Sequence, residues 1–238
     1  ATLIILFGLR DPEPCVLVTE PEQSSVRDVL GGDHKECYLL TGAPDLSPRA
    51  IVRIPHVGRI LTLQFLVFLA FNFYYVAFPV YAATALAWTL LDVGLYFAAM
   101  GILMAVVEGP VLGRLSRRVG DRPLVIAGSL LLAASFVFFI SERTAVLYAG
   151  TALLAVGNGL MWPSLLAVLS KTTDRDAQGA VQGFSGSVNA VASILGLLLG
   201  GLVYQAGGSG VFLLSAVMTA AVCLLAFGLP RVAVTRTG

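Results

Sequence analysis

Six long apolar runs, separated by short polar segments, dominate the chain from residue 58 to residue 230. They cover residues 60–83, 90–113, 123–140, 145–169, 177–204 and 211–229. An α-helix rises about 1.5 Å per residue, so about 20 apolar residues cross the roughly 30 Å hydrocarbon core of a bilayer. The pattern therefore predicts an all-α, polytopic membrane protein whose six transmembrane helices pack as a bundle.

The apolar and polar segments divide the chain into four parts. Residues 1–9 are apolar and begin without Met or a basic stretch, which indicates the tail of a truncated transmembrane helix. Residues 10–57 are polar and rich in proline, as is typical of a central loop or linker. Residues 58–230 are expected to form the six-helix transmembrane domain, and residues 231–238 a short tail.

Composition also indicates a membrane protein. Hydrophobic residues make up 57% of the chain and charged residues only 12%, with a mean hydropathy of +0.87. Average soluble domains carry about 25% charged residues, so this chain has too few charges to cover a soluble surface. The net charge of +1 gives no reason to expect a nucleic-acid partner. The lipid bilayer is the partner that composition implies.

Basic residues are distributed unevenly between the two ends of the predicted helices. Every lysine and arginine except Arg143 falls in segments on one side of the membrane, including Arg114, Arg117, Arg118 and Arg122 in one short connection. Loops on the cytoplasmic side are the ones that retain lysine and arginine. Both ends of the chain, and the linker with them, are therefore predicted to be cytoplasmic.

Local signals mark where the predicted helices begin and bend. Thr89, with Asp92 three residues later, forms a capping-box pattern at the start of the second run. Pro79, Pro110 and Pro163 lie inside runs, where each removes a backbone hydrogen bond and frees the carbonyl four residues earlier. Membranes tolerate such breaks where protein or water surrounds them. The breaks are compatible with static kinks and with helices that bend beside a transport pathway.

The fifth run carries a stripe of small residues. Steps of three or four place most of them on one helix face; they are Gly179, Gly183, Gly186, Ala190, Ser193 and Gly200, with Gly196 offset by one position. Small residues let two membrane helices approach closely. This face is therefore predicted to pack against another helix.

The sequence contains no pattern typical of a catalytic or metal site. The two histidines, His34 and His56, lie in the linker, and the three cysteines have no metal-binding spacing. Ser164 and Ser170 have no histidine at a comparable membrane depth. We therefore expect a protein that is not an enzyme and that uses neither a metal nor a cofactor.

Glu108 is the one carboxylate that lies well inside a predicted transmembrane helix. An ionised group at that depth costs a few kcal/mol, so it should be paired, protonated or exposed to water. Desolvation favours the protonated form, which makes Glu108 a candidate for coupling transport to protons. The alternative is a structural pairing with an arginine of the following connection.

Neutral polar and aromatic residues near the helix breaks are candidates for a substrate cavity; they are Asn72, Tyr75, Asn158, Trp162 and Asn189. Asn72 and Tyr75 are three residues apart and share a helix face, as do Asn158 and Trp162 four residues apart. Amides and aromatic rings could line a pocket for an amphipathic solute. They could equally form hydrogen bonds between helices or lie at the membrane interface.

The connection between the second and third runs resembles a family motif. Its Gly113, Leu115, Arg118, Gly120 and Arg122 are similar to the loop signature of the major facilitator superfamily, which reads roughly G-x-L-a-D-R-x-G-R-R. The resemblance implies a loop that gates the cytoplasmic face, made of Gly113, Arg117, Arg118, Gly120, Asp121 and Arg122. The chain departs from the motif because Arg117 stands where the family has Asp, and Asp121 where a basic residue is usual.

Residues 145–204 also resemble helices ten and eleven of the drug:proton antiporters in this superfamily, through a glycine-rich helix with a proline (Gly157, Gly159, Pro163) and the small-residue helix after it. The resemblance implies the C-terminal half of a transporter, from the end of helix six to helix twelve, with a missing N-terminal six-helix half as its partner. The implied function is export of small amphipathic molecules or drugs in exchange for protons by alternating access, in a bacterial inner membrane. The alternatives are a uniporter or importer of sugars or other metabolites, and a membrane scaffold or sensor that transports nothing.

Overall fold

The structure, a computed structural model, describes residues 16–17, 36–37, 47–174 and 177–230. They belong to two compact units, which divide between Asp45 and Leu46. In the first unit the described residues form two short strands, β1 (Val16–Leu17) and β2 (Glu36–Cys37), which pair in parallel. The predicted helix tail at residues 1–9, most of the linker and the tail at residues 231–238 lie outside the described residues.

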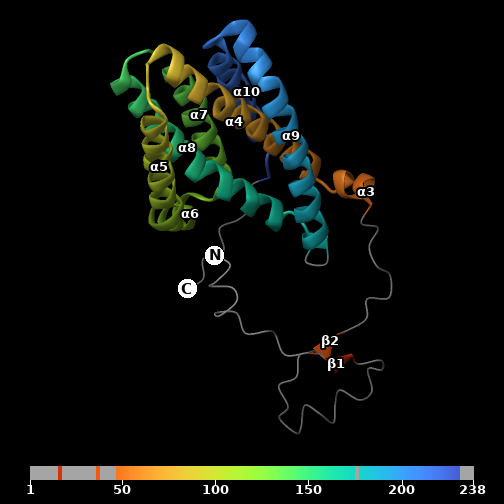
Figure 1. Ribbon diagram of the computed structural model, residues 1–238. Helices are drawn as coiled ribbons and strands as arrows, with labels where there is room; N and C mark the ends of the chain where they lie inside the picture. Colours follow the sequence, from red (N-terminus) through yellow and green to blue (C-terminus); the bar gives the residue numbers. More distant parts are fainter. Residues whose placement is uncertain (1–15, 18–35, 38–46, 175–176, 231–238) are drawn as a thin grey trace. The chain divides into compact units, whose positions relative to one another are not determined.

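The second unit is built from helices (Figure 1). In chain order they are α3 (Pro48–Arg53), α4 (Val57–Ala85), α5 (Leu90–Val106), the π-helical segment η2 (Val107–Val111), α6 (Leu112–Val119), α7 (Asp121–Phe138), α8 (Thr144–Lys171), α9 (Gln178–Gly207) and α10 (Gly210–Ala226). The predicted all-α bundle is confirmed, since every regular element described in this unit is a helix.

Six apolar helical segments correspond to the six predicted transmembrane runs. Five are long and apolar enough to cross a membrane, at 18 to 30 residues, and the second of them is α5 continued through η2 into α6. Helix α10 has 17 residues, which is the short end of the range for a spanning helix. The capping box predicted at Thr89 is confirmed, because its hydroxyl accepts from the backbone N–H of Asp92 and the Asp92 carboxylate accepts from that of Thr89.

The predicted gating loop is mostly helix. The second span does not end near Gly113, because α5 passes through η2 into α6, which continues to Val119. Gly120 is the single residue between α6 and α7, and its φ of 83° lies in the left-handed region that glycine adopts without strain. Arginine is a good helix former, so the basic segment extends the helix until Gly120 ends it. The prediction of a loop from Gly113 to Arg118 is therefore wrong.

Glycines let α7 and α8 approach until their backbones meet. A Cβ atom at Gly128 would lie 2.6 Å from the carbonyl oxygen of Gly157, and one at Gly157 would lie 2.8 Å from that of Gly128. Both distances are below van der Waals contact, so the present helix separation requires glycine at each position. Such close packing is how membrane helices gain contact without a hydrophobic driving force, and it fixes the part of α8 that carries Asn158.

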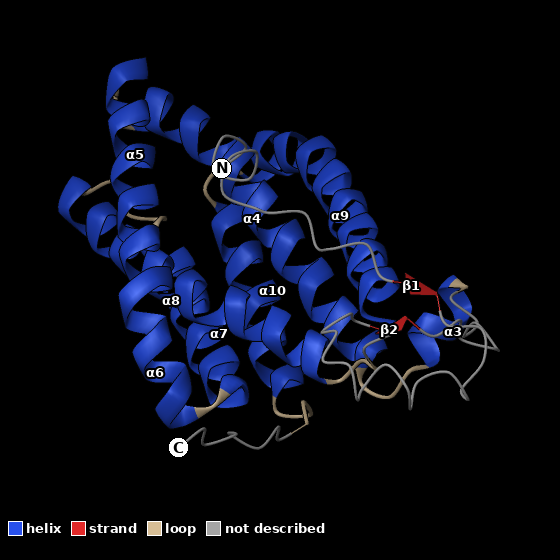
Figure 2. Ribbon diagram, turned by 90° about the horizontal axis from the view of Figure 1, so that it is seen from below, coloured by secondary structure: helices blue, strands red, loops and turns tan. Residues whose placement is uncertain are grey.

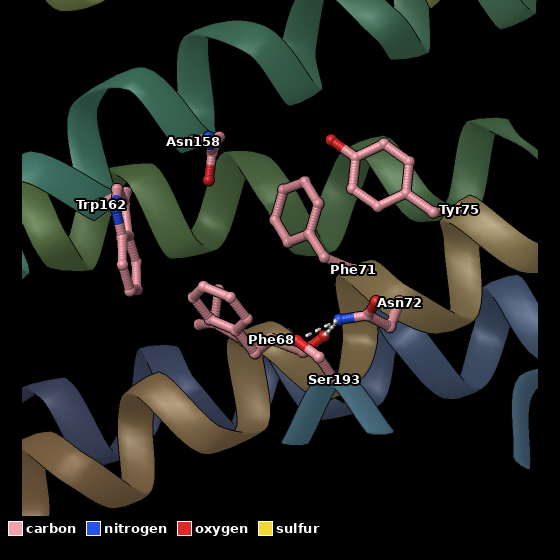
Figure 3. Close-up of a pocket in the computed structure, with 8 residues that line it drawn as sticks. Phe68, Phe71, Asn72, Tyr75, Asn158, Trp162 and Ser193 are labelled. Atoms are coloured by element: carbon pink, nitrogen blue, oxygen red, sulfur yellow. Dashed lines mark hydrogen bonds between the residues drawn. The ribbon is translucent and has the colours of Figure 1, made fainter. Parts of the chain in front are cut away.

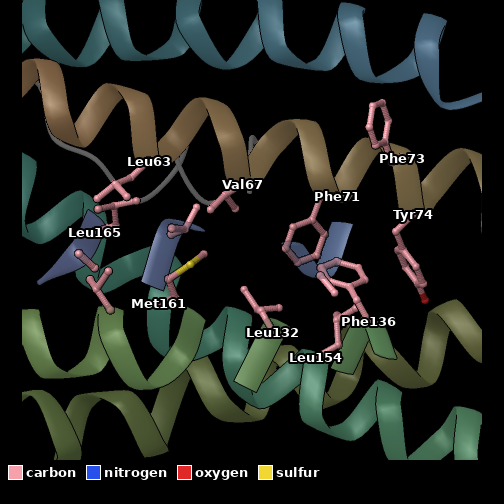
Figure 4. Packing of buried hydrophobic residues seen from close by; sticks show 14 of the residues in the cluster. Leu63, Val67, Phe71, Phe73, Tyr74, Leu132, Phe136, Leu154, Met161 and Leu165 are labelled. Carbon is pink, nitrogen blue, oxygen red and sulfur yellow. The ribbon is translucent and has the colours of Figure 1, made fainter. Parts of the chain in front are cut away.

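Aliphatic and aromatic side chains of α4, α7 and α8 pack together in the interior of the second unit (Figure 4). The ring of Tyr74 on α4 lies 5.9 Å from the ring of Phe136 on α7 and 4.9 Å from that of Phe139. Tilted and edge-on ring pairs at such distances are favourable beyond the area they bury. These ring contacts join α4 to the C-terminal end of α7.

Helix α9 runs beside α4 in the same direction. Two hydrogen bonds define the register: Ser185 Oγ donates to Gln64 Oε1 at 2.5 Å, and Asn72 Nδ2 donates to Ser193 Oγ at 3.2 Å. Further along, a Cβ atom at Gly196 would lie 2.5 Å from that of Asn72. Close backbone approach and side-chain hydrogen bonds therefore join the two helices.

The glycines in the first half of the predicted packing face of α9 meet no other helix among the described residues. A Cβ atom at Gly179, Gly183 or Gly186 would meet no atom within 4 Å, whereas one at Gly200 would lie 3.3 Å from the Cα of Phe73. Contact with α4 runs through Ser193 and Gly200 of the stripe, through the offset position Gly196, and through Ser185. Spacing alone identified a small-residue stripe, but the rotation of α9 about its axis decided which residues of it touch α4.

Helices α5 and α9 form the least buried parts of the bundle. The most apolar 18-residue stretch is 22% buried in the span Leu90–Ser116 and 17% buried in α9, against 56% in α4 and α8. Helix α4 is more central because it contacts both α9 and α10, while α10 also contacts α7 (Figure 2). The exposed faces of α5 and α9 are mostly apolar, as expected for surfaces that meet lipid or another transmembrane domain.

Candidate functional site

A pocket of about 270 Å³ opens between α4, α8 and α9 (Figure 3). Its lining consists of Val67, Phe68, Phe71, Asn72, Tyr75, Asn158, Trp162 and Ser193. Four of the five residues predicted from the sequence to line a cavity are among them. The fifth, Asn189, does not line the pocket and lies one turn before Ser193 on α9.

Helical periodicity explains why these polar residues meet. Asn72 and Tyr75 are three residues apart on α4, and Asn158 and Trp162 are four residues apart on α8, so each pair shares one face. In the structure both faces border the pocket. Ser193 was missed as a lining residue because only the register of α9 against α4 brings it beside Asn72.

Aromatic rings form the walls of the pocket. The ring of Phe68 meets that of Trp162 edge-on, with centroids 5.0 Å apart and an interplanar angle of 61°, and this contact joins α4 to α8. Phe71 and Tyr75 lie 5.9 Å apart further along α4. The two phenylalanines were not predicted as site residues, because nothing in an apolar helix distinguishes a phenylalanine facing a pocket from one facing lipid.

The polar groups of the pocket differ in how firmly they are held. Asn72 Nδ2 donates to the carbonyl oxygen of Phe68 at 2.7 Å and to Ser193 Oγ at 3.2 Å, so it serves as the interhelical link that was the alternative reading of this residue. Asn158 Nδ2 makes only a weak contact with Met104 Sδ at 3.9 Å. Tyr75 is 40% exposed, and its hydroxyl projects toward α8 in Figure 3. Tyr75 and Asn158 therefore present polar atoms that a solute can reach.

Two prolines inside continuous helices flank the pocket. Pro163 directly follows Trp162 in α8, and Pro79 follows Tyr75 by one turn in α4. Each proline lacks the N–H that would bond the carbonyl four residues earlier, which weakens the helix at that level. Tyr75 and Trp162 therefore sit next to points where α4 and α8 bend most easily.

Glu108 lies in η2, the π-helical segment that contains Pro110. Its side chain is exposed, and its Cγ approaches α8 closely enough that a Cβ atom at Gly159 would lie 3.4 Å from it. Gly159 also has the carbonyl that Pro163 frees. Glu108 therefore lies beside Gly159 of α8, the residue that follows Asn158, although it does not line the pocket itself.

A chain of buried hydroxyl groups joins α4, α5 and α8. It was not predicted from the sequence. Tyr74 Oη lies 2.8 Å from Tyr96 Oη, which lies 2.5 Å from Thr151 Oγ1. Thr151 Oγ1 also donates to the carbonyl oxygen of Leu147 at 2.8 Å. The sequence did contain an indication of this chain, because a hydroxyl group within an apolar transmembrane run needs a hydrogen-bond partner inside the protein.

Charged residues at the basic end of the bundle bind helix ends to one another. Asp121, 8% exposed at the start of α7, pairs with Lys171 at the end of α8 at 2.5 Å. Arg122 donates to the carbonyl oxygen of Phe227, and Arg59 to that of Gly228, both just after α10. Cations are favourable near the carbonyls at a helix C-terminus. Asp121 stands where the motif usually has a basic residue, and in this chain it pairs with a basic residue of another helix, Lys171.

In the described ranges, no group of three or more His, Cys, Asp or Glu residues could hold a metal ion. The lining of the pocket offers aromatic faces, amides and hydroxyls for binding. The carboxyl group of Glu108 lies on η2, next to Gly159 of α8.

Comparisons with known proteins agree with this architecture. The family model described as Major Facilitator Superfamily matches residues 60–237. The tetracycline resistance protein of class C from Escherichia coli is 27% identical over 205 residues, which cover 86% of this chain and 50% of that protein.

Two further relatives match shorter segments. The class B tetracycline resistance protein from Escherichia coli is 32% identical over 120 residues, covering 50% of this chain and 29% of that protein. The multidrug resistance protein MdtH of Sodalis glossinidius (strain morsitans) is 30% identical over 133 residues, covering 53% of this chain and 32% of that protein. The chain spans about half the length, or less, of these relatives.

Proposed function

This chain belongs to the Major Facilitator Superfamily, and from its pocket and the prolines inside its helices we propose that it is the C-terminal half of a secondary active transporter that exports small amphipathic molecules in exchange for protons. The observation that carries the proposal is the pocket between α4, α8 and α9, which combines aromatic walls with neutral amides. In secondary transporters the substrate site lies near the bilayer midplane, between two halves that rock against one another. The pocket would then be one wall of a cavity completed by an N-terminal half.

The lining of the pocket is suited to a substrate that is amphipathic and largely uncharged. None of its eight residues carries a charge, and four of them have aromatic rings. Rings stack on flat apolar groups, while the amides and the Tyr75 hydroxyl can bond polar substituents. The names of the relatives, which are resistance proteins for tetracycline and for multiple drugs, support export of drugs and make tetracycline the first probe.

Glu108 is proposed to exchange the proton. It is a carboxyl group within a spanning segment, where the ionised form is costly unless water or a partner reaches it. Its contact with α8 at Gly159 offers a path by which a change in its protonation would alter the position of Asn158. A π-helical segment is a common feature of functional sites in helices, since its backbone bonds rearrange easily.

The basic end of the bundle is proposed to face the cytoplasm and to close there. The excess of lysine and arginine at this end supports that orientation. The pair of Asp121 with Lys171 and the bonds from Arg59 and Arg122 to the end of α10 hold this end together. Within the proposed gate, Gly120 supplies the bend between α6 and α7, while Gly113 and Arg118 belong to the helix before it.

The proposal is tested by Glu108→Gln in the complete protein that contains this chain, assayed in everted membrane vesicles. An imposed pH gradient, acidic inside, should drive tetracycline uptake in the parent protein and should fail to do so in the variant. Glu142→Gln is the matched control, because Glu142 is exposed in the connection between α7 and α8. It should transport as the parent does.

The outcomes separate the parts of the proposal. Unchanged uptake by the Glu108→Gln variant would remove the coupling role from Glu108 while leaving export intact. Absence of gradient-driven uptake of both tetracycline and ethidium by the parent protein would contradict proton-coupled export of amphipathic molecules.

A further inference from the structure

Five polar residues form a seam between α4 and α9; they are Gln64, Asn72, Ser185, Asn189 and Ser193, and we call them the α4–α9 polar seam. Gln64 bonds Ser185 and Asn72 bonds Ser193, with the same sequence separation in both pairs. The two pairs are therefore equivalent steps of one parallel register. Asn189 lies halfway between Ser185 and Ser193 on α9, one helical turn from each.

Two amide groups of the seam are incompletely bonded. The Gln64 side chain is fully buried, and although its Oε1 accepts from Ser185, its Nε2 has no partner among the described residues. Asn189 Oδ1 is likewise buried without a partner. Turning the Gln64 amide over would leave Oε1 unpartnered in place of Nε2. A buried polar atom without a partner has lost its hydrogen bonds to water and makes none within the protein, which is unfavourable. We therefore expect a bound polar group to supply the missing hydrogen bonds.

The seam adjoins the pocket through one stripe of α4. Gln64, Phe68, Phe71 and Tyr75 follow one another at steps of four, three and four residues, which places them on a single helix face. The last three line the pocket, and Gln64 lies one turn beyond Phe68. The edge-on contact between Phe68 and Trp162 therefore lies at the end of the pocket that is nearest to Gln64.

We propose that the pocket continues past the Phe68–Trp162 contact into a polar subsite formed by Gln64 and Asn189, which binds an uncharged group that presents a hydrogen-bond acceptor beside a donor, such as a carboxamide. Gln64 Nε2 donates to the acceptor and Asn189 Oδ1 accepts from the donor. The group is uncharged because neither the pocket lining nor the seam contains a charged side chain.

Access to the subsite requires a shift of the Trp162 ring, and α8 is weakest at that residue. Pro163 follows Trp162 directly and leaves the carbonyl of Gly159 without its helical bond. The inference rests on the proposed function, because it assigns the polar end of the transported molecule to Gln64 and Asn189. Its aromatic end remains with the rings of the pocket.

Tryptophan fluorescence of the complete protein that contains this chain, in detergent micelles, reports binding at this place. Trp88 and every other tryptophan except Trp162 are replaced by phenylalanine, which leaves Trp162 as the single emitter. The probes are naphthalene-2-carboxamide and 2-isopropylnaphthalene, which match in shape and differ in hydrogen-bonding groups. Gln64→Met and Asn189→Leu remove the polar atoms at similar volume. Gln182→Met is the control, since Gln182 is exposed near the start of α9.

The carboxamide should bind on the order of tenfold more tightly than the isopropyl compound, as expected for two added hydrogen bonds. Gln64→Met and Asn189→Leu should each reduce that ratio toward one, mainly by weakening the carboxamide, whereas Gln182→Met should leave it unchanged. Circular dichroism identifies any variant that does not fold, and the other variant then decides.

Equal affinity of the two probes for the parent chain, or an unchanged ratio in the folded variants, would overturn the subsite and leave the pocket in place. Quenching of Trp162 by neither probe would instead contradict the pocket as a binding site, and with it the proposed function.

Discussion

Removing one hydroxyl from the buried chain of Tyr74, Tyr96 and Thr151 should destabilise the bundle more than its size suggests. Tyr96→Phe deletes the oxygen that lies 2.8 Å from Tyr74 Oη and 2.5 Å from Thr151 Oγ1. The ring itself remains, including its stacked contact with Phe78 at 4.4 Å between centroids. The substitution therefore isolates the hydrogen bonds from the packing.

The magnitude follows from which groups are left without partners. Thr151 keeps its bond to the carbonyl oxygen of Leu147 at 2.8 Å, so it is still satisfied. Tyr74 is fully buried and retains only Met100 Sδ at 3.9 Å. One orphaned hydroxyl costs about 1–3 kcal/mol, and interhelical bonds in membranes average about 0.6 kcal/mol in double-mutant cycles. We expect Tyr96→Phe to lower the free energy of unfolding by about 1–2 kcal/mol.

A double-mutant cycle tests the reasoning. Tyr74→Phe together with Tyr96→Phe removes the orphaned hydroxyl, so the pair should be closer to the parent chain than Tyr96→Phe alone. Unfolding in mixed micelles with increasing dodecyl sulfate, followed by tryptophan fluorescence, supplies the free energies. Tyr148→Phe is the matched control, because Tyr148 is 45% exposed. An unchanged stability of Tyr96→Phe, or a double variant that loses more than Tyr96→Phe does, would refute the reasoning.

Two further predictions use the same unfolding measurement. Gly128→Ala should lower the free energy of unfolding by about 1–3 kcal/mol, because its Cβ would lie 2.6 Å from a backbone oxygen of α8 that cannot move aside. The control is Gly183→Ala, whose Cβ would meet no atom within 4 Å and which should leave the stability unchanged. Equal effects of the two substitutions would contradict the packing described. Lys171→Met should cost about 1 kcal/mol, because it leaves the largely buried Asp121 carboxylate without its partner while the lysine itself is 48% exposed. Loss of stability should vanish when Asp121→Asn is added, and its persistence would show that the lysine stabilises the bundle in another way.

Features encoded within one helical turn were predictable from the sequence. The capping box at Thr89 depends on two residues three positions apart, and both of its hydrogen bonds are present. The prolines at 79 and 163 lie inside helices, as expected from the length of the apolar runs around them. Short-range chemistry decides these features, since the groups that interact are neighbours in the chain.

The sequence did not decide the structure where a local pattern was compatible with two arrangements. Glycines and arginines from Gly113 to Arg118 resembled a loop, yet the same arginines are good helix formers and α6 continues to Val119. The small residues of α9 lie on more than one face, and Gly196 rather than Gly183 touches α4. Neither the length of α6 nor the rotation of α9 about its axis follows from the local pattern alone. Packing between helices decides the rotation of α9.

By itself, the sequence determined that this protein lies in a membrane, that its second unit is a bundle of apolar helices, and where prolines interrupt their backbone hydrogen bonding, because lipid demands long apolar helices and proline lacks an N–H. Only the tertiary structure decided which faces meet. It placed Ser193 beside Asn72, Phe68 against Trp162 and Glu108 against Gly159, since side chains on different helices are brought together by packing and not by spacing along the chain.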